Sequence, residues 1–389
     1  MYLPALIITV FFSCNLLAHS FEKRNLTLRG SLQNSRLVFE NNRKGRVAFI
    51  GGSITEMNGY RPMMIEFFKE KFPQTDFEFI NAGISSTCST TGAFRLERDI
   101  LSHGPIDLLF LEFAVNDDQD ARHSPEACVR GFEGIVRNFR SRFPLGDLVV
   151  TYFVNPDMLA QLLKGENPVS MDSHEIILKK YQVSRIHLAR ELATQIQAGS
   201  MSWETFGGTH PKPAGNRLCT QMHQELFESV WNSPRPPSPL PHSMPKNPVD
   251  PKSFFRGRFF SPENIQLQKG WKFSEPNWEE LKGKKRSRYL DRPLLHANAP
   301  ADPLCFSFEG QAVGAFLLAG PDAGIIEFEI DGGTKGEINL LHHYSKNLHY
   351  PRSVIFSYDL PPGPHRISLQ PNVSEQGGTA VRILEFCIN

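Results

Sequence analysis

The chain of 389 residues lacks the patterns that mark several protein classes. Its formal net charge is +1 and its only basic cluster, residues 282–288, has the composition of a solvated loop, so no segment is dense enough in Lys and Arg to follow a nucleic-acid backbone. No two cysteines form a close pair such as C-x-x-C, which argues against a zinc knuckle or a dithiol redox motif. We therefore expect no nucleic-acid partner, no metal and no organic cofactor.

Long apolar runs are also absent beyond the N-terminus. Residues 3–18 are apolar but short for a membrane span, and they end in the small-residue pattern Leu17-Ala-His-Ser20. This pattern predicts a signal peptide over residues 1–20 and a secreted or periplasmic protein without stable membrane insertion. Because no Lys or Arg precedes the run, a retained N-terminal anchor is the alternative. Removal of the signal would leave five cysteines, an odd number, so at least one would stay outside any intramolecular disulfide.

Residues 21–232 alternate apolar strands with amphipathic helices, which predicts an α/β domain with a parallel sheet covered on both faces. Ser124 is a suitable N-cap ahead of Pro125 at the first position of one helix. The expected strands are Val47–Ile50, Phe77–Ile80, Asp107–Phe113 and Leu148–Val154. The expected helices are Tyr60–Phe72, Gly92–Ser102, Ser124–Phe143, Ser173–Gln197 and Lys212–Trp231.

Residues 233–252 form a Pro-rich linker, since they hold eight prolines with few large apolar residues and cannot build a core. Beyond the linker, short alternating runs are separated by Gly, Pro and Asp turns, without helices between them. This pattern predicts an antiparallel β-sandwich over residues 253–389. Its expected strands are Leu304–Phe308, Val313–Leu318, Ile325–Ile330, Ile338–Leu341, Val354–Tyr358, Arg366–Leu369 and Val381–Cys387.

Three small or polar residues follow the ends of predicted strands in the first domain. Ser53, Gly83 and Asn116 should meet at one rim, because a parallel sheet brings its carboxyl ends together. They supply a hydroxyl that can attack a carbonyl, the N–H groups of Ser53 and Gly83, and an amide, all of which suit the oxyanion of acyl transfer. These residues would supply the nucleophile and the oxyanion donors of an esterase, but not its general base.

His210 is the candidate base among the histidines. It lies in the Gly-rich loop Trp203-Glu-Thr-Phe-Gly-Gly-Thr-His-Pro211, directly before the last helix of the α/β domain. A loop in that position can return an imidazole to the rim that carries Ser53.

Four blocks of this chain, in this order, resemble those of the SGNH hydrolases, also called the GDSL esterase/lipase superfamily. They are Gly51-Gly-Ser53, Asn81-Ala-Gly83, Val115-Asn-Asp117 and Gly208-Thr-His-Pro211, and the resemblance spans about residues 46–231. It implies a flavodoxin-like sheet, Ser53 as nucleophile, and His210 as base. It also implies an oxyanion hole formed by the N–H groups of Ser53 and Gly83 with the Asn116 amide.

Two positions depart from the family pattern. Gly52 stands where Asp is common, and Gly207 stands where the family usually carries an Asp that orients the histidine. Three possibilities are open at Gly207: Glu204 reaches the imidazole in its place, a backbone carbonyl orients a Ser-His dyad, or the site is silent and the domain only binds.

Other polar positions concern the substrate. Arg61 and Asp117 are candidates to bind it. The favoured alternative for Arg61 is a surface arginine at a helix start, and the alternative for Asp117 is a turn cap. The loop His342-His-Tyr-Ser-Lys-Asn-Leu-His-Tyr350 could bind sugar, ligate a metal through His342, His343 and His349, or be purely structural.

The predicted function is a secreted serine esterase that hydrolyses short acyl esters, acetyl first, on a carbohydrate or another small ester. This substrate class rests on the export signal, the family resemblance and the second domain, which broadly resembles the jelly-roll domains that accompany some carbohydrate esterases. A lipase or phospholipase and a catalytically silent glycan-binding protein are the alternatives.

Overall fold

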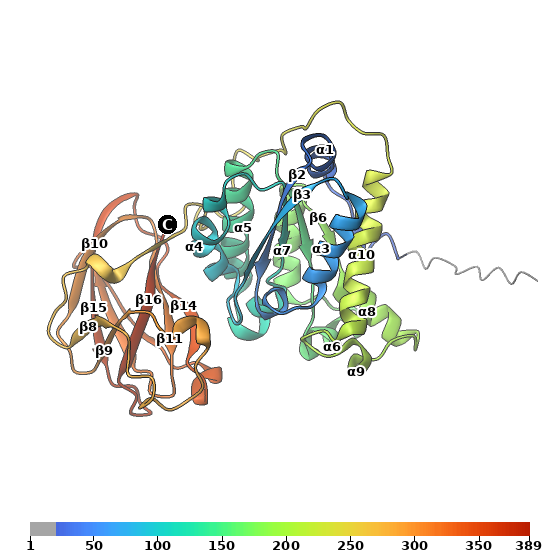
Figure 1. The fold of residues 1–389 in the computed structure, drawn as a ribbon. Helices are drawn as coiled ribbons and strands as arrows, with labels where there is room; N and C mark the ends of the chain where they lie inside the picture. The colour runs from blue at the N-terminus through green and yellow to red at the C-terminus, as the bar shows by residue number, and fades with distance from the viewer. Residues whose placement is uncertain (1–20) are drawn as a thin grey trace, which may run out of the picture.

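The computed structural model describes residues 21–389 as an α/β part followed by an antiparallel β-sandwich (Figure 1). This architecture confirms the predicted fold class. The predicted signal peptide lies outside the described residues. The limits of the domains remain predictions.

The sheet of the α/β part has the strand order β1-β6-β5-β4-β2-β3. Strands β2 to β6 are mutually parallel, whereas the short β1 pairs antiparallel with β6 at the edge. The order β3-β2-β4-β5-β6 is that of a flavodoxin-like sheet. The strands are β1 (Leu26–Thr27), β2 (Lys44–Gly51), β3 (Asp76–Gly83), β4 (Leu108–Leu111), β5 (Asp147–Thr151) and β6 (Ser184–Ile186).

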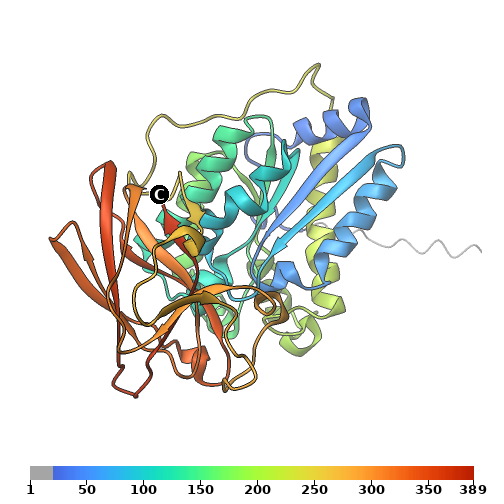
Figure 2. The same ribbon diagram turned by 60° about the vertical axis from the view of Figure 1, so that its left-hand side comes forward.

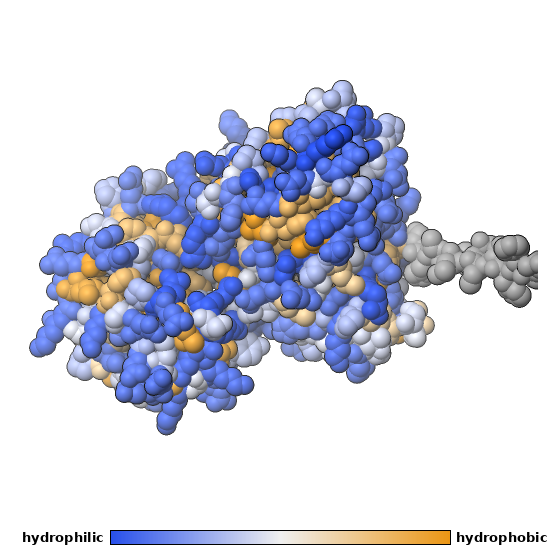
Figure 3. Space-filling model, in the orientation of Figure 1, coloured by the Kyte–Doolittle hydropathy of each residue, from blue (hydrophilic) through white to orange (hydrophobic). Residues whose placement is uncertain are grey.

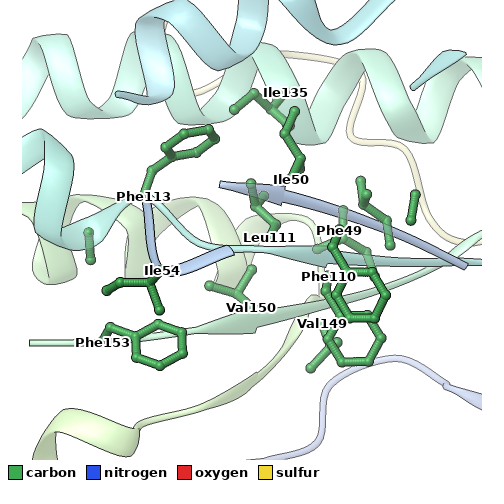
Figure 4. Packing of buried hydrophobic residues seen from close by; sticks show 14 of the residues in the cluster. Phe49, Ile50, Ile54, Phe110, Leu111, Phe113, Ile135, Val149, Val150 and Phe153 are labelled. Carbon is green, nitrogen blue, oxygen red and sulfur yellow. The ribbon is translucent and has the colours of Figure 1, made fainter. Parts of the chain in front are cut away.

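Apolar side chains on both faces explain why the central strands lie inside the molecule. Phe49 of β2 stacks on Phe110 of β4 with ring centroids 4.6 Å apart, while Ile50 points to the opposite side, toward Ile135 of the covering helix (Figure 4). Such continuous hydrophobic runs are typical of parallel strands covered on both faces.

Helices α5 and α10 are the longest of the covering helices. Helix α5 packs with α4 and α7, and α10 packs with α3 and α8. Ser124 caps α5 by accepting a hydrogen bond from the Ala127 N–H at 3.3 Å, and Pro125 is its first residue, as predicted. The helices are α1 (Gln33–Asn42), α2 (Ser53–Glu56), α3 (Tyr60–Lys71), α4 (Ser89–Asp99), α5 (Pro125–Arg142), α6 (Pro156–Leu163), α7 (Val169–Lys180), α8 (Leu188–Gln197), α9 (Trp203–Phe206) and α10 (Pro213–Trp231), with short helical turns η1 (Leu101–His103) and η2 (Asn116–Asp120).

The single helix predicted over residues 173–197 is wrong. The structure has α7, then the buried strand β6, then α8. Gln182 follows the first helix in a left-handed conformation with φ +50°, and the His187 side chain caps the second by accepting from the Arg190 N–H at 3.2 Å. A strand of three residues is too short to interrupt a helical hydrophobic pattern visibly.

Two antiparallel sheets form the sandwich, with orders β10-β15-β12-β13 and β14-β11-β16-β9-β8, and β7 pairs with β16. Six of the predicted strands correspond to β10 (Leu304–Gly310), β11 (Val313–Ala319), β12 (Ile325–Ile330), β14 (Tyr350–Ser357), β15 (Gly363–Asn372) and β16 (Ala380–Ile388). The strand predicted over Ile338–Leu341 overlaps only the end of β13 (Thr334–Asn339), which begins earlier. The sequence pattern did not predict β7 (Arg258–Phe260), β8 (Trp271–Ser274) or β9 (Leu294–Asn298). Helical turns η3 (Pro262–Asn264), η4 (Ser287–Tyr289) and η5 (His343–Lys346) lie in its connections.

The segment between α10 and β7 has no helix or strand and arches over the α/β part before it enters the sandwich (Figure 2). Side chains of the α/β part bind its backbone along the way. Glu133 accepts from the N–H groups of Val249 and Asp250 at 2.6 and 2.8 Å, and Arg137 donates to the Pro245 carbonyl at 2.9 Å. The predicted linker is therefore an extended strap held against the first part.

The two parts share buried apolar residues. Phe316 and Leu384 of the sandwich belong to the same hydrophobic cluster as the α/β core, and the ring of Phe254 lies 4.7 Å from that of Phe94 in α4. On the outside, hydrophilic residues alternate with scattered apolar patches over both parts (Figure 3). Within residues 21–389, no helix combines the length and apolarity required to cross a membrane.

Candidate active site

Ser53 begins α2 directly after β2, at the carboxyl end of the sheet. Buried side chains hold the turn that presents it. The Glu112 carboxylate accepts from the Gly52 N–H at 2.8 Å and from the Thr55 hydroxyl at 2.7 Å. Arg95 lies beneath and donates to the Gly51 carbonyl at 2.9 Å, which ties the end of β2 to α4.

Burial raises the pKa of Glu112 to about 7, although its hydrogen bonds from Thr55 and Gly52 favour the ionised form. Both hydrogen bonds go to the same carboxylate oxygen, Oε1. The second oxygen can therefore carry a proton without loss of either contact.

The close approach of Asn116 explains glycine at position 52. A Cβ on Gly52 would lie 2.0 Å from Asn116 Oδ1. The Asp that is common in the family cannot occupy this position while the Asn116 amide stays where it is.

His210 meets Ser53 across the rim, with its Nε2 2.7 Å from Ser53 Oγ. Helix α9 and the start of α10 hold its loop from both sides. The Lys212 N–H donates to the Phe206 carbonyl at 2.9 Å, and Asn216 Nδ2 donates to the Pro211 carbonyl at 2.7 Å. The imidazole is exposed while Ser53 is half-buried, so the pair lies open to solvent.

No carboxylate within residues 21–389 makes a hydrogen bond or ion pair with His210. Glu204 is fully exposed, and hydrogen bonds from its own N–H and from Ser202 at the start of α9 lower the pKa of its carboxyl. The structure thus does not bring the predicted acid to the imidazole. An Asp at position 207 is also excluded, because Gly207 has φ +110° and a Cβ there would lie 2.2 Å from the Lys212 nitrogen.

Asn116 begins the π-helical turn η2 at the end of β4 and is buried. Its Nδ2 donates one hydrogen bond to Asp120 Oδ2 at 2.9 Å. The Ser53 N–H has no acceptor among the described residues. The Ser53 N–H and the second N–H of the Asn116 amide are thus free of acceptors within residues 21–389, and their use as oxyanion donors stays a prediction.

The Gly83 N–H, which the sequence predicts to be an oxyanion donor, has an acceptor in this structure. That N–H already donates to Asn81 Oδ1 at 3.0 Å. Glycine is required there for packing instead, because a Cβ would lie 2.2 Å from the Glu56 nitrogen in α2. A strand-and-loop pattern cannot reveal that the side chain of Asn81 turns back onto the amide.

Ser86 carries the free amide that sequence reasoning missed. The neighbouring N–H groups of Ile84, Ser85 and Thr87 are all bonded, whereas the Ser86 N–H has no acceptor within residues 21–389. Ser86 adopts the left-handed conformation with φ +68°, which is uncommon for a residue other than glycine. Nothing in the residue type signals a free amide at this position.

The side chains of Arg61 and Asp117, the two predicted substrate contacts, already have partners within the protein. Arg61 donates to the Thr55 carbonyl at 3.3 Å and to Asn58 Oδ1 at 3.0 Å, which stabilises the loop after α2. Asp117 is completely buried, so it does not reach a substrate at the rim. Burial favours its neutral form, but the nearby His123 imidazole and the hydrogen bond from His174 outweigh burial and hold the pKa of Asp117 below its ordinary value.

One donor set in the described residues has the chemistry of a soft cation site. Cys88, Asp117 and His123 bring a thiol, a carboxylate and an imidazole within 4.8 Å of one another. Asp117 already accepts from the Ser89 N–H and from His174 Nε2, both at 2.8 Å. These hydrogen bonds satisfy the buried carboxylate without a metal.

The sandwich loop with several histidines packs against the α/β part. His342 Nε2 bonds to the Asp120 carbonyl at 2.8 Å, and His349 Nε2 bonds to the Lys282 carbonyl at 2.9 Å, so the two imidazoles have separate partners. A cavity of about 320 Å³ opens beside this loop, between the two parts. Ser86, Asp120, His342 and Tyr350 are among its lining residues, whereas Ser53 and His210 are not.

Searches by sequence find no matching protein-family model and no matching curated protein. Among solved structures, the chain is similar to a two-domain esterase (CEX) active on acetylated mannans, co-crystallized with mannopentaose. The TM-score is 0.73 at 19% identity, over 94% of this chain and 97% of that one. A second structure of a two-domain esterase (CEX) active on acetylated mannans gives 0.72 at 18% identity with the same coverage. At these identities the likeness establishes a shared fold that includes both parts.

Proposed function

We propose that this protein is a serine esterase that removes short acyl groups, acetyl first, from carbohydrate. The observation that carries the proposal is the 2.7 Å contact between Ser53 Oγ and His210 Nε2 at the carboxyl end of a parallel sheet. This distance lies within the range of a nucleophile and its general base.

In the proposed reaction, His210 Nε2 accepts the proton of the Ser53 hydroxyl as its oxygen attacks the ester carbonyl. The imidazole then protonates the leaving alcohol oxygen, and water, deprotonated by the same Nε2, releases the acid from the acyl-serine. The imidazole must carry its own proton on Nδ1 for Nε2 to act as the base. With no carboxylate of residues 21–389 bonded to that nitrogen, a Ser-His dyad is the form of the site that we propose.

The oxyanion of the tetrahedral intermediate would be bound by three donors: the N–H groups of Ser53 and Ser86 and the second N–H of the Asn116 amide. All three are free of other acceptors in the described residues, which supports this set over one that contains Gly83. Preorganised donors of this kind are each worth about 10²–10³ in turnover.

The substrate class is supported by two observations. The exposed His210 and half-buried Ser53 leave the site open to a bulky alcohol such as a glycan. The fold shared over both parts is that of an esterase active on acetylated mannans. We also propose that the α/β part belongs to the SGNH hydrolases and that the protein is exported, both of which rest on the sequence.

Hydrolysis of p-nitrophenyl esters tests this function. We expect wild type to cleave the acetate faster than the octanoate, and Ser53→Ala to lower kcat/KM at least about a thousandfold. Ser102→Ala, a change at an exposed serine, is the matched control and should match wild type. Preference for octanoate would favour a lipase. Equal background rates for wild type and Ser53→Ala, on nitrophenyl acetate and on acetylated mannan and xylan oligosaccharides alike, would refute the esterase.

A further inference from the structure

Side chains of the sandwich reach the residues beside Ser53. Tyr350 begins β14, His342 precedes η5, and Arg286 precedes η4. All three bind groups of the α/β part that lie next to the oxyanion donors, rather than Ser53 or His210 themselves. They can therefore fix the positions of the proposed oxyanion donors without contacting the substrate.

Asp120 connects the two parts. Its Oδ2 accepts from Asn116 Nδ2 at 2.9 Å, and its Oδ1 accepts from the Tyr350 hydroxyl at 2.6 Å. Its backbone carbonyl accepts from His342 Nε2 at 2.8 Å. The His342 ring also stacks on the Tyr350 ring, with centroids 4.1 Å apart and planes at 5°. Tyr350 and Asp120 are both buried, and both line the cavity between the two parts.

The carboxylate of Asp120 determines which way the Asn116 amide faces. A carboxylate accepts hydrogen bonds and repels an amide oxygen, so Asn116 must present Nδ2 to it and Oδ1 toward Gly52. An amide nitrogen has two hydrogens. One is used by Asp120, and the other stays free for an oxyanion.

Ser86 is held by the same group of sandwich residues. Arg286 donates to Ser86 Oγ at 2.7 Å and to the Ser85 carbonyl. The Tyr350 oxygen lies 3.3 Å from the Ser86 carbonyl, although its single proton is directed to the closer Asp120 carboxylate. The loop that presents the Ser86 N–H is therefore braced from the second part.

We propose that Tyr350 and Asp120 are positioning residues that fix the Asn116 amide for oxyanion binding, so that the sandwich is a working part of the catalytic site. The proposal rests on the esterase function above. It assigns to the second part a role in turnover that is separate from any binding of glycan.

Tyr350→Phe in the full chain tests the proposal, because it removes the hydroxyl and keeps the ring against His342. We expect kcat for p-nitrophenyl acetate to fall about tenfold with KM within twofold of wild type. Affinity for phenylboronic acid, which forms a tetrahedral adduct on a catalytic serine, should fall by the same factor. Tyr344→Phe is the matched control, since the Tyr344 hydroxyl has no partner in the described residues, and it should leave all three values unchanged.

If Tyr350→Phe lowers the melting temperature by more than a few degrees, its loss of activity could reflect instability, and Asp120→Asn then tests the proposal independently. An amide at 120 no longer selects one orientation of Asn116, so kcat should again fall. The kcat of the double variant should be no lower than that of the more impaired single variant, because both changes break the same chain of hydrogen bonds from Tyr350 through Asp120 to Asn116. If the wild type is active and both Tyr350→Phe and Asp120→Asn keep its kcat, the positioning role of Tyr350 and Asp120 is refuted while the esterase function is not. An inactive wild type would overturn both.

Discussion

At the scale of single residues, the backbone of its loop holds His210 beside Ser53. Phe206 and Asn216 bind the loop ends on either side of the imidazole. Gly207 stands where the SGNH hydrolases usually carry Asp, and this loop requires glycine because φ is positive and a Cβ would meet Lys212. The conformation of this loop therefore explains why the chain has no Asp at position 207.

Glu204→Gln should leave kcat within twofold of wild type. Its exposed carboxylate interacts with the start of α9 and not with His210. Steady-state hydrolysis of p-nitrophenyl acetate is the measurement. A tenfold loss would show that Glu204 swings onto the imidazole during turnover.

Gly207→Asp should destabilise the protein without raising its turnover. A left-handed conformation costs a non-glycine residue about 1–2 kcal/mol, and the contact with Lys212 adds to this. Thermal unfolding measures the loss. Gly208→Ala is the control, because Gly208 has a similar φ of +89° but its Cβ would meet only Trp203 at 4.0 Å. Equal melting temperatures for the two variants, or faster hydrolysis by Gly207→Asp, would contradict this account.

At the scale of elements, the central strands and the loops that follow them were predictable, because four-residue apolar runs that end in small residues are typical of buried parallel strands. The same reasoning placed Ser53, Gly83 and Asn116 at one rim, and the position of the Gly-rich loop before the last helix added His210. Sequence patterns could not predict features that depend on a single contact or on a very short element. The Asn81 side chain occupies the Gly83 amide, and the strand β6 of three residues disappears into a helical pattern.

Glu112 should make the stability of the protein depend on pH. Burial raises its folded pKa from 4.5 to about 7, so the folded protein binds this proton more tightly than the unfolded chain does. The free energy of unfolding should therefore decrease as pH rises from about 4.5 to about 7, and change little through this group above that.

Glu112→Gln mimics the protonated form and should remove this contribution. Melting temperatures of both proteins between pH 4.5 and 8 measure it. The wild type should lose more stability than the variant over this interval. Parallel curves would show that Glu112 does not titrate in that range.

At the scale of the whole molecule, the two parts meet through apolar packing and through the polar contacts of Asp120 and Ser86. Phe316, Leu384 and Phe254 lie in one buried cluster with the α/β core. The linker is also bound along α5. Such an interface is typical of parts that unfold together.

Calorimetry should accordingly show one unfolding transition for the full chain, with equal calorimetric and van't Hoff enthalpies. Phe316→Ala should lower stability by about 3 kcal/mol, within the range for a buried aromatic, while keeping a single transition. Two resolved transitions in the wild type would show that the sandwich is only tethered.

The central claim is that Ser53 is the nucleophile, and covalent labelling tests it most directly. The folded wild type is incubated with diethyl p-nitrophenyl phosphate and analysed by intact mass and peptide mapping. We predict one diethylphosphoryl group per chain, on the peptide that contains Ser53, with labelling abolished in Ser53→Ala and strongly slowed in His210→Asn. Labelling of another residue, or equal labelling of wild type and Ser53→Ala, would contradict the claim.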